Sequence, residues 1–151
     1  MNLYTAGYEG INIDQFVDLL NNNDTEALID IRDNPNSRKP GFSRKALAEI
    51  LNEHGIEYAP FYALGTPRNI RKSYRKDNDW DTFSKKYLEY LDGQADEVTH
   101  LAQKAENQRC CLLCFEADYT KCHRLYVAAA VKEAAAYPLE IVHLSAPAKS
   151  K

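Results

Sequence analysis

Residues 110–115, Cys-Cys-Leu-Leu-Cys-Phe, decide the fold class of this chain. Six consecutive apolar residues are typical of a strand that is buried on both faces of a parallel sheet. A second apolar run, Glu-Ala-Leu-Ile-Asp-Ile-Arg at residues 26–32, ends on charged side chains and is broken by the polar and proline-rich residues that follow. Shorter strand patterns lie at 2–6, 56–62 and 139–144.

Amphipathic helix patterns separate these strands. Asn12 and Ser43 are suited to cap the first two helices, and Gly55 is suited to end the second one. The expected helices cover 13–22, the segment between Ser43 and Gly55, 80–91, 95–107 and 125–136. Strand and helix alternate through five cycles. The sequence therefore predicts an α/β fold, a three-layer sandwich with a mainly parallel sheet of about five strands.

Length and composition indicate one globular domain. The chain has 151 residues, of which 44% are hydrophobic and 27% charged, values close to the globular average. We expect a single α/β domain at 1–144 and a flexible polar tail at 145–151. No apolar stretch approaches the roughly 20 residues of a membrane helix, and the first ten residues do not resemble a secretion signal. The expected location is the cytoplasm, without membrane contact.

The cysteines indicate the same compartment. Cys110, Cys111, Cys114 and Cys122 lie too close together to connect distant parts of the chain, as the disulfides of a secreted scaffold do. We interpret all four as thiols.

The charge of the chain is unevenly distributed. Its net charge is −3, which argues against a generally basic nucleic-acid binder. Yet residues 32–76 hold 10 of the 19 Lys and Arg and only 4 of the 22 Asp and Glu. Within them, residues 68–76 interleave Tyr74 with five cations and are predicted as a solvated loop. A non-catalytic nucleic-acid-associated module that uses the basic loops 32–45 and 68–76 is therefore the alternative function, with contacts from Arg68, Arg71, Lys72 and Arg75.

Polar and reactive residues concentrate where the predicted strands end. In open α/β sheets, ligands bind beyond the carboxyl ends of the strands. The strongest local signal is Thr-Lys-Cys-His-Arg at 120–124. Asp118 or Thr120 could cap the following helix and place Cys122 in its first turn. The helix N-terminus and the neighbouring basic side chains would then favour the thiolate form of Cys122. The plain structural interpretation is a half-buried cysteine at a helix start.

These positions define the expected site. Cys122 would be the nucleophile, His123 or Glu116 an acid or base, and Tyr8 a hydroxyl donor. Asp30 and Arg32, two residues apart at a strand end, are placed to pair with each other. The residues expected to hold an anion are Arg32, Ser37, Arg38, Arg124, Gly7 and Gly65.

A zinc site is a separate hypothesis. Cys114, Cys122 and His123 are zinc ligand types, and Glu116 could be a fourth ligand or a catalytic base. Their spacing does not match known zinc motifs, and no second Cys-x-x-Cys pair exists. We therefore predict no metal and no cofactor, and keep a zinc-dependent activity as a third hypothesis.

Four segments resemble the signature segments of the domain of unknown function 488 family of bacterial and archaeal proteins. They are YTAGYEG at 4–10, LIDIRDNPNSRKPGFSRKAL at 28–47, GIEYAPFYALG at 55–65 and CLLCFEADYTKCHR at 111–124. The resemblance implies an α/β sandwich but no established reaction. The family pattern falls on Gly7, Tyr8, Asp30, Arg32, Pro35, Ser37, Leu64, Gly65, Cys114, Glu116, Cys122, His123 and Arg124.

A weaker likeness is to rhodanese-type domains. In those domains one strand ends in Asp-x-Arg and a later strand ends in a nucleophilic cysteine, as LIDIR and CLLC do here. Their anion-cradling loop requires Gly and Arg soon after the cysteine. Cys114 is followed by FEADYTK, and its nearest Arg is ten residues on. This spacing argues against sulfur transfer from Cys114.

The function predicted first is an enzyme or ligand-binding domain for a small anionic molecule, phosphorylated or nucleotide-like, at the C-terminal edge of the sheet. The sequence leaves open whether the chain is catalytic, and it does not indicate an oligomeric state. The expected partner is a small anionic ligand, with nucleic acid second.

Overall fold

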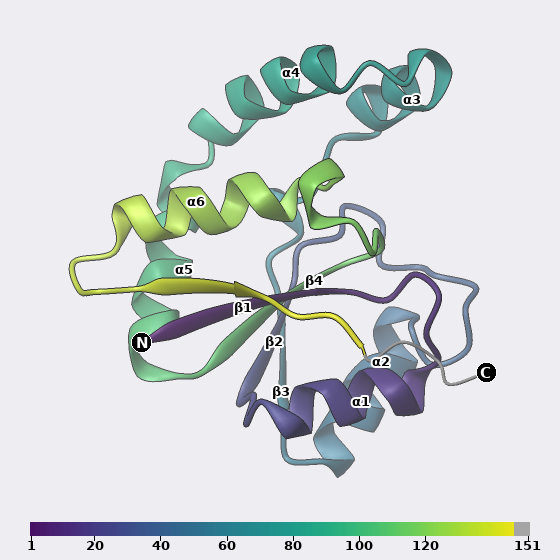
Figure 1. The fold of residues 1–151 in the computed structure, drawn as a ribbon, viewed down its shortest axis with the longest axis vertical. Helices are drawn as coiled ribbons and strands as arrows, with labels where there is room; N and C mark the ends of the chain where they lie inside the picture. The colour runs from purple at the N-terminus through teal and green to yellow at the C-terminus, as the bar shows by residue number, and fades with distance from the viewer. Residues whose placement is uncertain (147–151) are drawn as a thin grey trace.

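A computed structural model of the chain describes residues 1–146 and has one five-stranded sheet at its centre (Figure 1). All strand pairs are parallel, and the strand order is β3-β2-β4-β1-β5. The α/β class and the parallel sheet of five strands are confirmed. The strands are β1 (Asn2–Gly7), β2 (Ala27–Asp30), β3 (Glu57–Pro60), β4 (Cys110–Cys114) and β5 (Glu140–His143). Residues 147–151, most of the predicted tail, lie outside the described residues.

Helices cover both faces of this sheet, which confirms the three layers (Figure 1). Helices α1 (Ile13–Asn22) and α2 (Arg44–Glu53) pack on one face. The other face is covered by α5 (Ala95–Asn107) and α6 (Arg124–Ala134), while α4 (Trp80–Asp92) lies beyond α6 and α3 (Arg68–Asp77) lies beside α4. Two short 3-10 helices, η1 (Tyr62–Leu64) and η2 (Tyr119–Lys121), complete the fold. None of the described helices is long and apolar enough to cross a membrane.

The continuous apolar runs are explained by burial on both faces. In β4, Leu112 packs into the core under α4, α5 and α6, whereas Leu113 packs into the core under α1 and α2. All five residues of β4 and all four of β2 are buried. Because successive side chains of a strand point to opposite faces, a central strand needs apolar residues at every position.

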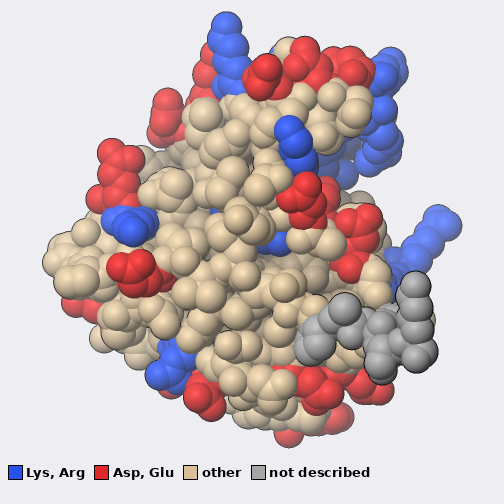
Figure 2. Space-filling view, viewed as in Figure 1, with Lys and Arg blue, Asp and Glu red and all other residues tan. Residues whose placement is uncertain are grey.

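The basic segment at 68–76 is part of helix α3, so the predicted loop is wrong. Ile70 and Tyr74 are four residues apart and lie on the same face of the helix. Ile70 is buried, and the Tyr74 ring packs against Trp80 and Phe83 of α4. Asn78 ends the helix in the left-handed conformation. The cations therefore lie on the exposed side of a packed helix, and Figure 2 shows basic side chains gathered over α3 at the upper right.

The connections open a crevice at the carboxyl end of β4. Its neighbours β1 and β2 are followed by α1 and α2 on one face, whereas β4 is followed by α6 on the other face. Adjacent strands whose chains leave in opposite directions form a topological switch point, where open α/β sheets bind ligands. The segments that follow β1, β2 and β4 together contain more of the predicted site residues than the segments that follow the other strands.

Candidate functional site

A cavity of about 560 Å³ lies at this switch point. One wall comes from the segments that follow β1, β2 and β4, and it contains six predicted site residues. They are Tyr8, Arg32, Glu116, Cys122 and His123 from the main hypothesis, and Cys114 from the zinc hypothesis. Further lining residues come from α3, α4 and η2, namely Arg71, Tyr74, Arg75, Trp80, Phe83 and Lys121. Two cations of the alternative nucleic-acid surface, Arg71 and Arg75, thus face the same space as the cysteines.

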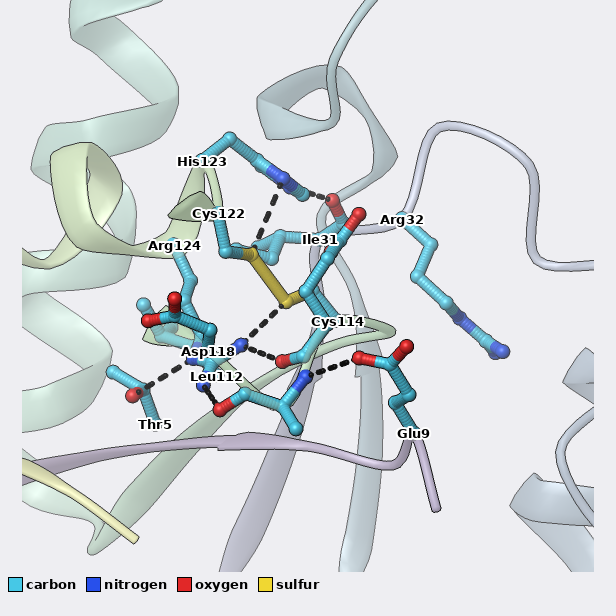
Figure 3. Close-up of a disulfide and its surroundings, with 12 residues drawn as sticks. Thr5, Glu9, Ile31, Arg32, Leu112, Cys114, Asp118, Cys122, His123 and Arg124 are labelled. Atoms are coloured by element: carbon cyan, nitrogen blue, oxygen red, sulfur yellow. Dashed lines mark hydrogen bonds between the residues drawn. A yellow bond between two sulfur atoms is a disulfide. The ribbon is translucent and has the colours of Figure 1, made fainter. Parts of the chain in front are cut away.

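Cys114 and Cys122 meet in this cavity wall. Cys114 is the last residue of β4, Cys122 follows η2, and their Sγ atoms are joined as a disulfide (Figure 3). The interpretation of all four cysteines as thiols is therefore wrong for this pair. The turn through η2 brings the chain back over the end of β4, so cysteines only eight residues apart make contact. Cys110 and Cys111 are free and buried within β4, and burial raises the pKa of Cys110 to about 12.

Arg124 places a positive charge next to Cys114. Its side chain is only 1% exposed and donates a 2.9 Å hydrogen bond to Cys114 Sγ. It also donates to Thr5 Oγ1 and to the backbone oxygens of Glu116 and Ala117. No carboxylate of the described residues forms an ion pair with it. Burial lowers the pKa of Arg124, but arginine keeps its proton in proteins. A charged donor at this distance favours the thiolate form of Cys114 over the thiol.

Cys122 lies outside the helix, so its predicted place in the first helical turn is wrong. Asp118 caps η2 instead of α6, and α6 begins at Arg124. Cys122 has an extended backbone, with φ −138° and ψ 143°. Cys122 therefore precedes the helix, and the Arg124 guanidinium donates its hydrogen bond to Cys114 Sγ instead of to Cys122.

His123 is a neutral neighbour of Cys122. Its Nε2 lies 2.8 Å from the backbone oxygen of Ile31, which can only accept a hydrogen bond, so Nε2 carries the proton. The other ring nitrogen, Nδ1, is then an acceptor and lies 3.8 Å from Cys122 Sγ (Figure 3). Burial lowers the pKa of His123 to about 4. At neutral pH this imidazole can accept a hydrogen bond from the Cys122 thiol.

Glu116 completes the group around the two sulfurs. One of its carboxylate oxygens and the Sγ atoms of Cys114 and Cys122 all lie within 4.8 Å of one another. Burial raises the pKa of Glu116, and Arg124 opposes this effect only in part. Two thiolates and a carboxylate are ligand types for zinc. Because a bond between the sulfurs would occupy both of them, a metal ion and the disulfide are mutually exclusive states of this site.

Gly7 and Gly65 act in the close approach of loops. A Cβ atom at Gly7 would collide with the backbone oxygen of Glu116 and lie 3.0 Å from the Arg124 guanidinium. A Cβ atom at Gly65 would collide with the backbone of Asp33. Neither glycine lines the cavity. Their absent side chains let the segments after β4 and β2 pack closely against their neighbours.

Arg32 and Asp30 form the pair that their spacing suggests. Arg32 donates from Nε and Nη2 to the two oxygens of Asp30, at 2.9 and 2.8 Å. Its Nη1 donates to the backbone oxygen of Phe42 at 2.6 Å and lies 3.4 Å from the Tyr8 hydroxyl. The Tyr58 hydroxyl also donates to Asp30. Arg32 lines the cavity, but most of its hydrogen-bonding capacity holds the loop after β2 in place.

The remaining predicted residues lie outside the cavity. Ser37 Oγ accepts a hydrogen bond from the Lys39 backbone, and Lys39 in turn donates to the backbone oxygen of Tyr8. Arg38 is exposed, and neither it nor Ser37 lines the cavity. Arg68 and Lys72 are exposed on α3 and do not line it either.

Comparison with known proteins assigns the chain to a family. The family model described as Domain of unknown function DUF488 matches residues 12–131. The chain belongs to this family. The match includes the cavity residues from Arg32 to His123 and leaves out Tyr8. This DUF488 domain is also similar to monothiol glutaredoxin-4 of Saccharomyces cerevisiae, with 38% identity over 58 residues. That similarity covers 38% of the chain and 23% of the glutaredoxin. No solved structure matches the chain.

Sequence reasoning missed the aromatic wall of the DUF488 cavity and one buried hydroxyl. Trp80 stands in the acidic stretch DNDWD at 77–81, which follows the basic segment. It stacks on Phe83, with ring centroids 4.7 Å apart. Thr66 also lines the cavity, and its buried Oγ1 has no hydrogen-bond partner among the described residues. The lone tryptophan was an available signal, whereas nothing in the sequence distinguishes Thr66.

Proposed function

We propose that this DUF488 domain binds a small anionic molecule, phosphorylated or nucleotide-like, in the cavity at the C-terminal edge of the sheet and acts on it through the cysteine pair. One observation carries the proposal: a single cavity is lined by both cysteines, by surplus cations and by an aromatic wall. Its volume of about 560 Å³ lies within the roughly 300–1,000 Å³ of small-molecule sites.

The charge of the lining favours an anion. Arg71 is paired with Asp33 at 2.9 Å. Arg75 and Lys121 also line the cavity and make no ion pair among the described residues. The lining includes only two acidic side chains, those of Asp33 and Glu116. Unpaired cations around a partly enclosed space attract phosphate or carboxylate groups.

The aromatic wall favours a ligand with a flat ring. Trp80 stacks on Phe83, and the Lys121 ammonium lies 5.5 Å from the centre of the Trp80 ring. A base can stack on such a surface while a cation beside it holds the phosphate. The unsatisfied Thr66 hydroxyl offers a further partner, because a buried polar group without a hydrogen bond costs free energy that a ligand would recover.

The chemistry would come from the cysteine pair. The sequence favours Cys122 as the nucleophile, with His123, Glu116 and Tyr8 as helpers. The contact of Arg124 with Cys114 favours Cys114 as the thiolate and leaves Cys122, beside His123, as its partner. The name of the similar yeast protein, a monothiol glutaredoxin, also agrees with thiol chemistry.

Melting temperatures with and without ligand test the binding. A mononucleotide at 100 times its Kd should stabilise the reduced protein by about 2.7 kcal/mol, which raises Tm by at least about 5 °C for a chain of this size. Arg75→Ala should reduce this shift by half or more. Arg68→Ala is the matched control, because Arg68 is an exposed cation of the same helix outside the cavity. No shift with mononucleotides or phosphate, or equal losses in both variants, would overturn the proposal.

The nucleic-acid alternative keeps one supporting observation. Lys72, Arg75 and Lys76 line a second, shallow hollow on α3 and make no ion pair among the described residues. A short single-stranded oligonucleotide would bind there with an affinity that falls as salt rises. The Lys72→Glu/Lys76→Glu variant should abolish that binding but keep the mononucleotide shift. Binding of the mononucleotide alone would exclude this alternative.

A further inference from the structure

We propose that Cys114 and Cys122 are a redox-active pair that exchanges with the disulfides of small anionic thiols. This activity goes beyond ligand binding. It rests on the proposed function only in that both use the same cavity. Three sets of observations support it: the contact between the sulfurs, their unequal surroundings and their access through the cavity.

The first observation is that the two sulfurs are held together by different parts of the fold. Gly7 of β1 pairs with Cys114 in the parallel ladder, which holds Cys114 at the end of β4. Cys122 stands between η2 and α6, and its Sγ is joined to that of Cys114 (Figure 3). Both cysteines line the cavity, whereas Cys110 and Cys111 do not. Of the four cysteines, only Cys114 and Cys122 can therefore react with a molecule inside the cavity.

The second observation assigns a role to each cysteine. Arg124 donates to Cys114 Sγ at 2.9 Å, so the reduced pair carries its negative charge on Cys114. Cys122 Sγ instead lies 3.8 Å from the unprotonated Nδ1 of His123. Cys114 is then the attacking thiolate, and Cys122 is the resolving thiol, which can donate a hydrogen bond to His123 Nδ1.

The exchange needs no oxidant or reductant other than the disulfide, and water supplies the proton that Cys114 lost when it ionised. The Cys114 thiolate attacks one sulfur of a disulfide RSSR, forms a mixed disulfide and releases RS⁻, which takes a proton from water. Cys122, whose S–H points to His123 Nδ1, then attacks Cys114 Sγ and gives its proton to the second departing RS⁻. The dithiol loses two electrons and RSSR gains them, so the products are the Cys114–Cys122 disulfide and two RSH. The reverse reaction oxidises two RSH.

The third observation limits the substrate. Cys114 and Cys122 are only 1% and 2% exposed, so a disulfide on the surface of another protein cannot approach them. A small molecule reaches them through the cavity, where the cations Arg75 and Lys121 attract anions. The expected substrate class is the disulfide of a low-molecular-mass thiol with carboxylates. Oxidised glutathione has this chemistry and serves as the probe.

Peptide mapping tests the exchange. The fully reduced protein is incubated with oxidised glutathione and a chelator, quenched in acid, blocked with N-ethylmaleimide and digested with trypsin. Cleavage after Arg109, Lys121 and Arg124 separates residues 110–121 from residues 122–124. We expect these two peptides to be joined, with fragmentation locating the bond at Cys114. The joined peptides should form at least about tenfold faster than in the urea-unfolded chain.

Two variants test the assigned roles. Cys122→Ser should stop at a stable glutathione adduct on Cys114, and Cys114→Ser should form its adduct at least about tenfold more slowly. Cys111→Ala is the matched control, because this free cysteine of β4 lies outside the cavity; its rate should equal that of the native chain. Equal rates in the two serine variants, or no linkage in the native chain, would overturn the proposal.

The two proposals can fail separately. The Cys114→Ser/Cys122→Ser variant lacks the redox pair but keeps the cations and the aromatic wall, so its mononucleotide Tm shift should persist. Linkage in the native chain without any nucleotide shift would leave the exchange standing and overturn the binding proposal. A nucleotide-induced Tm shift without linkage of Cys114 to Cys122 would leave the binding proposal standing and overturn the exchange. Rapid reduction of insulin, a disulfide-bonded protein, would contradict the restriction to small molecules.

Discussion

Two buried arginines at the carboxyl edge of the sheet have opposite surroundings. Arg32, 6% exposed, donates two hydrogen bonds to the carboxylate of Asp30. Arg124, 1% exposed, donates to backbone oxygens, a hydroxyl and the Cys114 sulfur, with no carboxylate in ion-pair distance among the described residues. In Figure 3 the Arg124 side chain reaches the sulfurs, whereas that of Arg32 points away from them.

Arginine therefore has two different roles at this one edge of the sheet. Burial acts to lower the pKa of both arginines, because it disfavours the charged form. The hydrogen bonds that Arg32 donates to Asp30, together with the negative charge of Asp30, outweigh this effect and raise the pKa of Arg32, whereas the pKa of Arg124 stays lowered. The charge of Arg32 is therefore compensated within the loop it supports. The charge of Arg124 remains available to Cys114.

The largest expected effect comes from breaking the compensated pair. Asp30→Asn leaves Arg32 buried without its carboxylate, and we expect the free energy of unfolding to fall by about 3–5 kcal/mol in urea titrations. Asp33→Asn is the matched control, because its pair with Arg71 has side chains 38% and 32% exposed. It should cost less than about 1 kcal/mol. Similar losses of unfolding free energy in the two variants would show that the buried Asp30–Arg32 pair contributes no more to stability than the exposed Asp33–Arg71 pair does.

The second-largest expected effect is a loss of folding stability in acid, which follows from the lowered pKa of His123 next to Arg124. The pKa of His123 is about 4 in the folded chain against 6.5 when unperturbed, chiefly because of burial, with Arg124 adding to the effect. As pH falls from 6.5 to 4, the unfolded chain therefore binds a proton that the folded chain does not. Folding stability should fall over this range by about 3 kcal/mol.

Urea titrations at pH 7 and pH 4.5 measure this loss, and His123→Gln is the reference. Carboxylates of the chain titrate in both proteins, so the difference between the two pH dependences isolates the histidine. We expect the native chain to lose more stability on acidification than the variant does. An equal loss in both would place the folded pKa of His123 near its ordinary value.

The fold was largely predictable because its signals are local. The apolar run of β4 and the amphipathic pattern of α1 identify their elements without any tertiary contact. Helix α3 was missed because its apolar stripe is only Ile70 and Tyr74 among many cations. Packing on α4 shows that these two residues form the apolar side of a helix, and the local sequence does not contain that contact.

The site was predictable only in part, for the same reason. Parallel strands all end at one edge, so the exits that bring Tyr8, Arg32 and Cys114 together could be expected. The capping of η2 by Asp118, which leaves Cys122 before α6, could not be expected, because helix ends depend on local capping choices. Distance along the chain also hides one contact of the Cys114 sulfur. The arginine ten residues after Cys114 contacts its sulfur in space.

The smallest expected effect isolates the contact of the Arg124 guanidinium with the Cys114 sulfur. Arg124→Lys keeps a cation but cannot hold the sulfur and two backbone oxygens at once. In the reduced protein, alkylation of Cys114 by neutral iodoacetamide should slow about tenfold, equivalent to about 1.4 kcal/mol. Arg32→Lys should leave this rate unchanged although it weakens the pair with Asp30. If both variants slowed alkylation equally, the reactivity of Cys114 would depend on the packing of the whole edge instead of on the one guanidinium that contacts its sulfur.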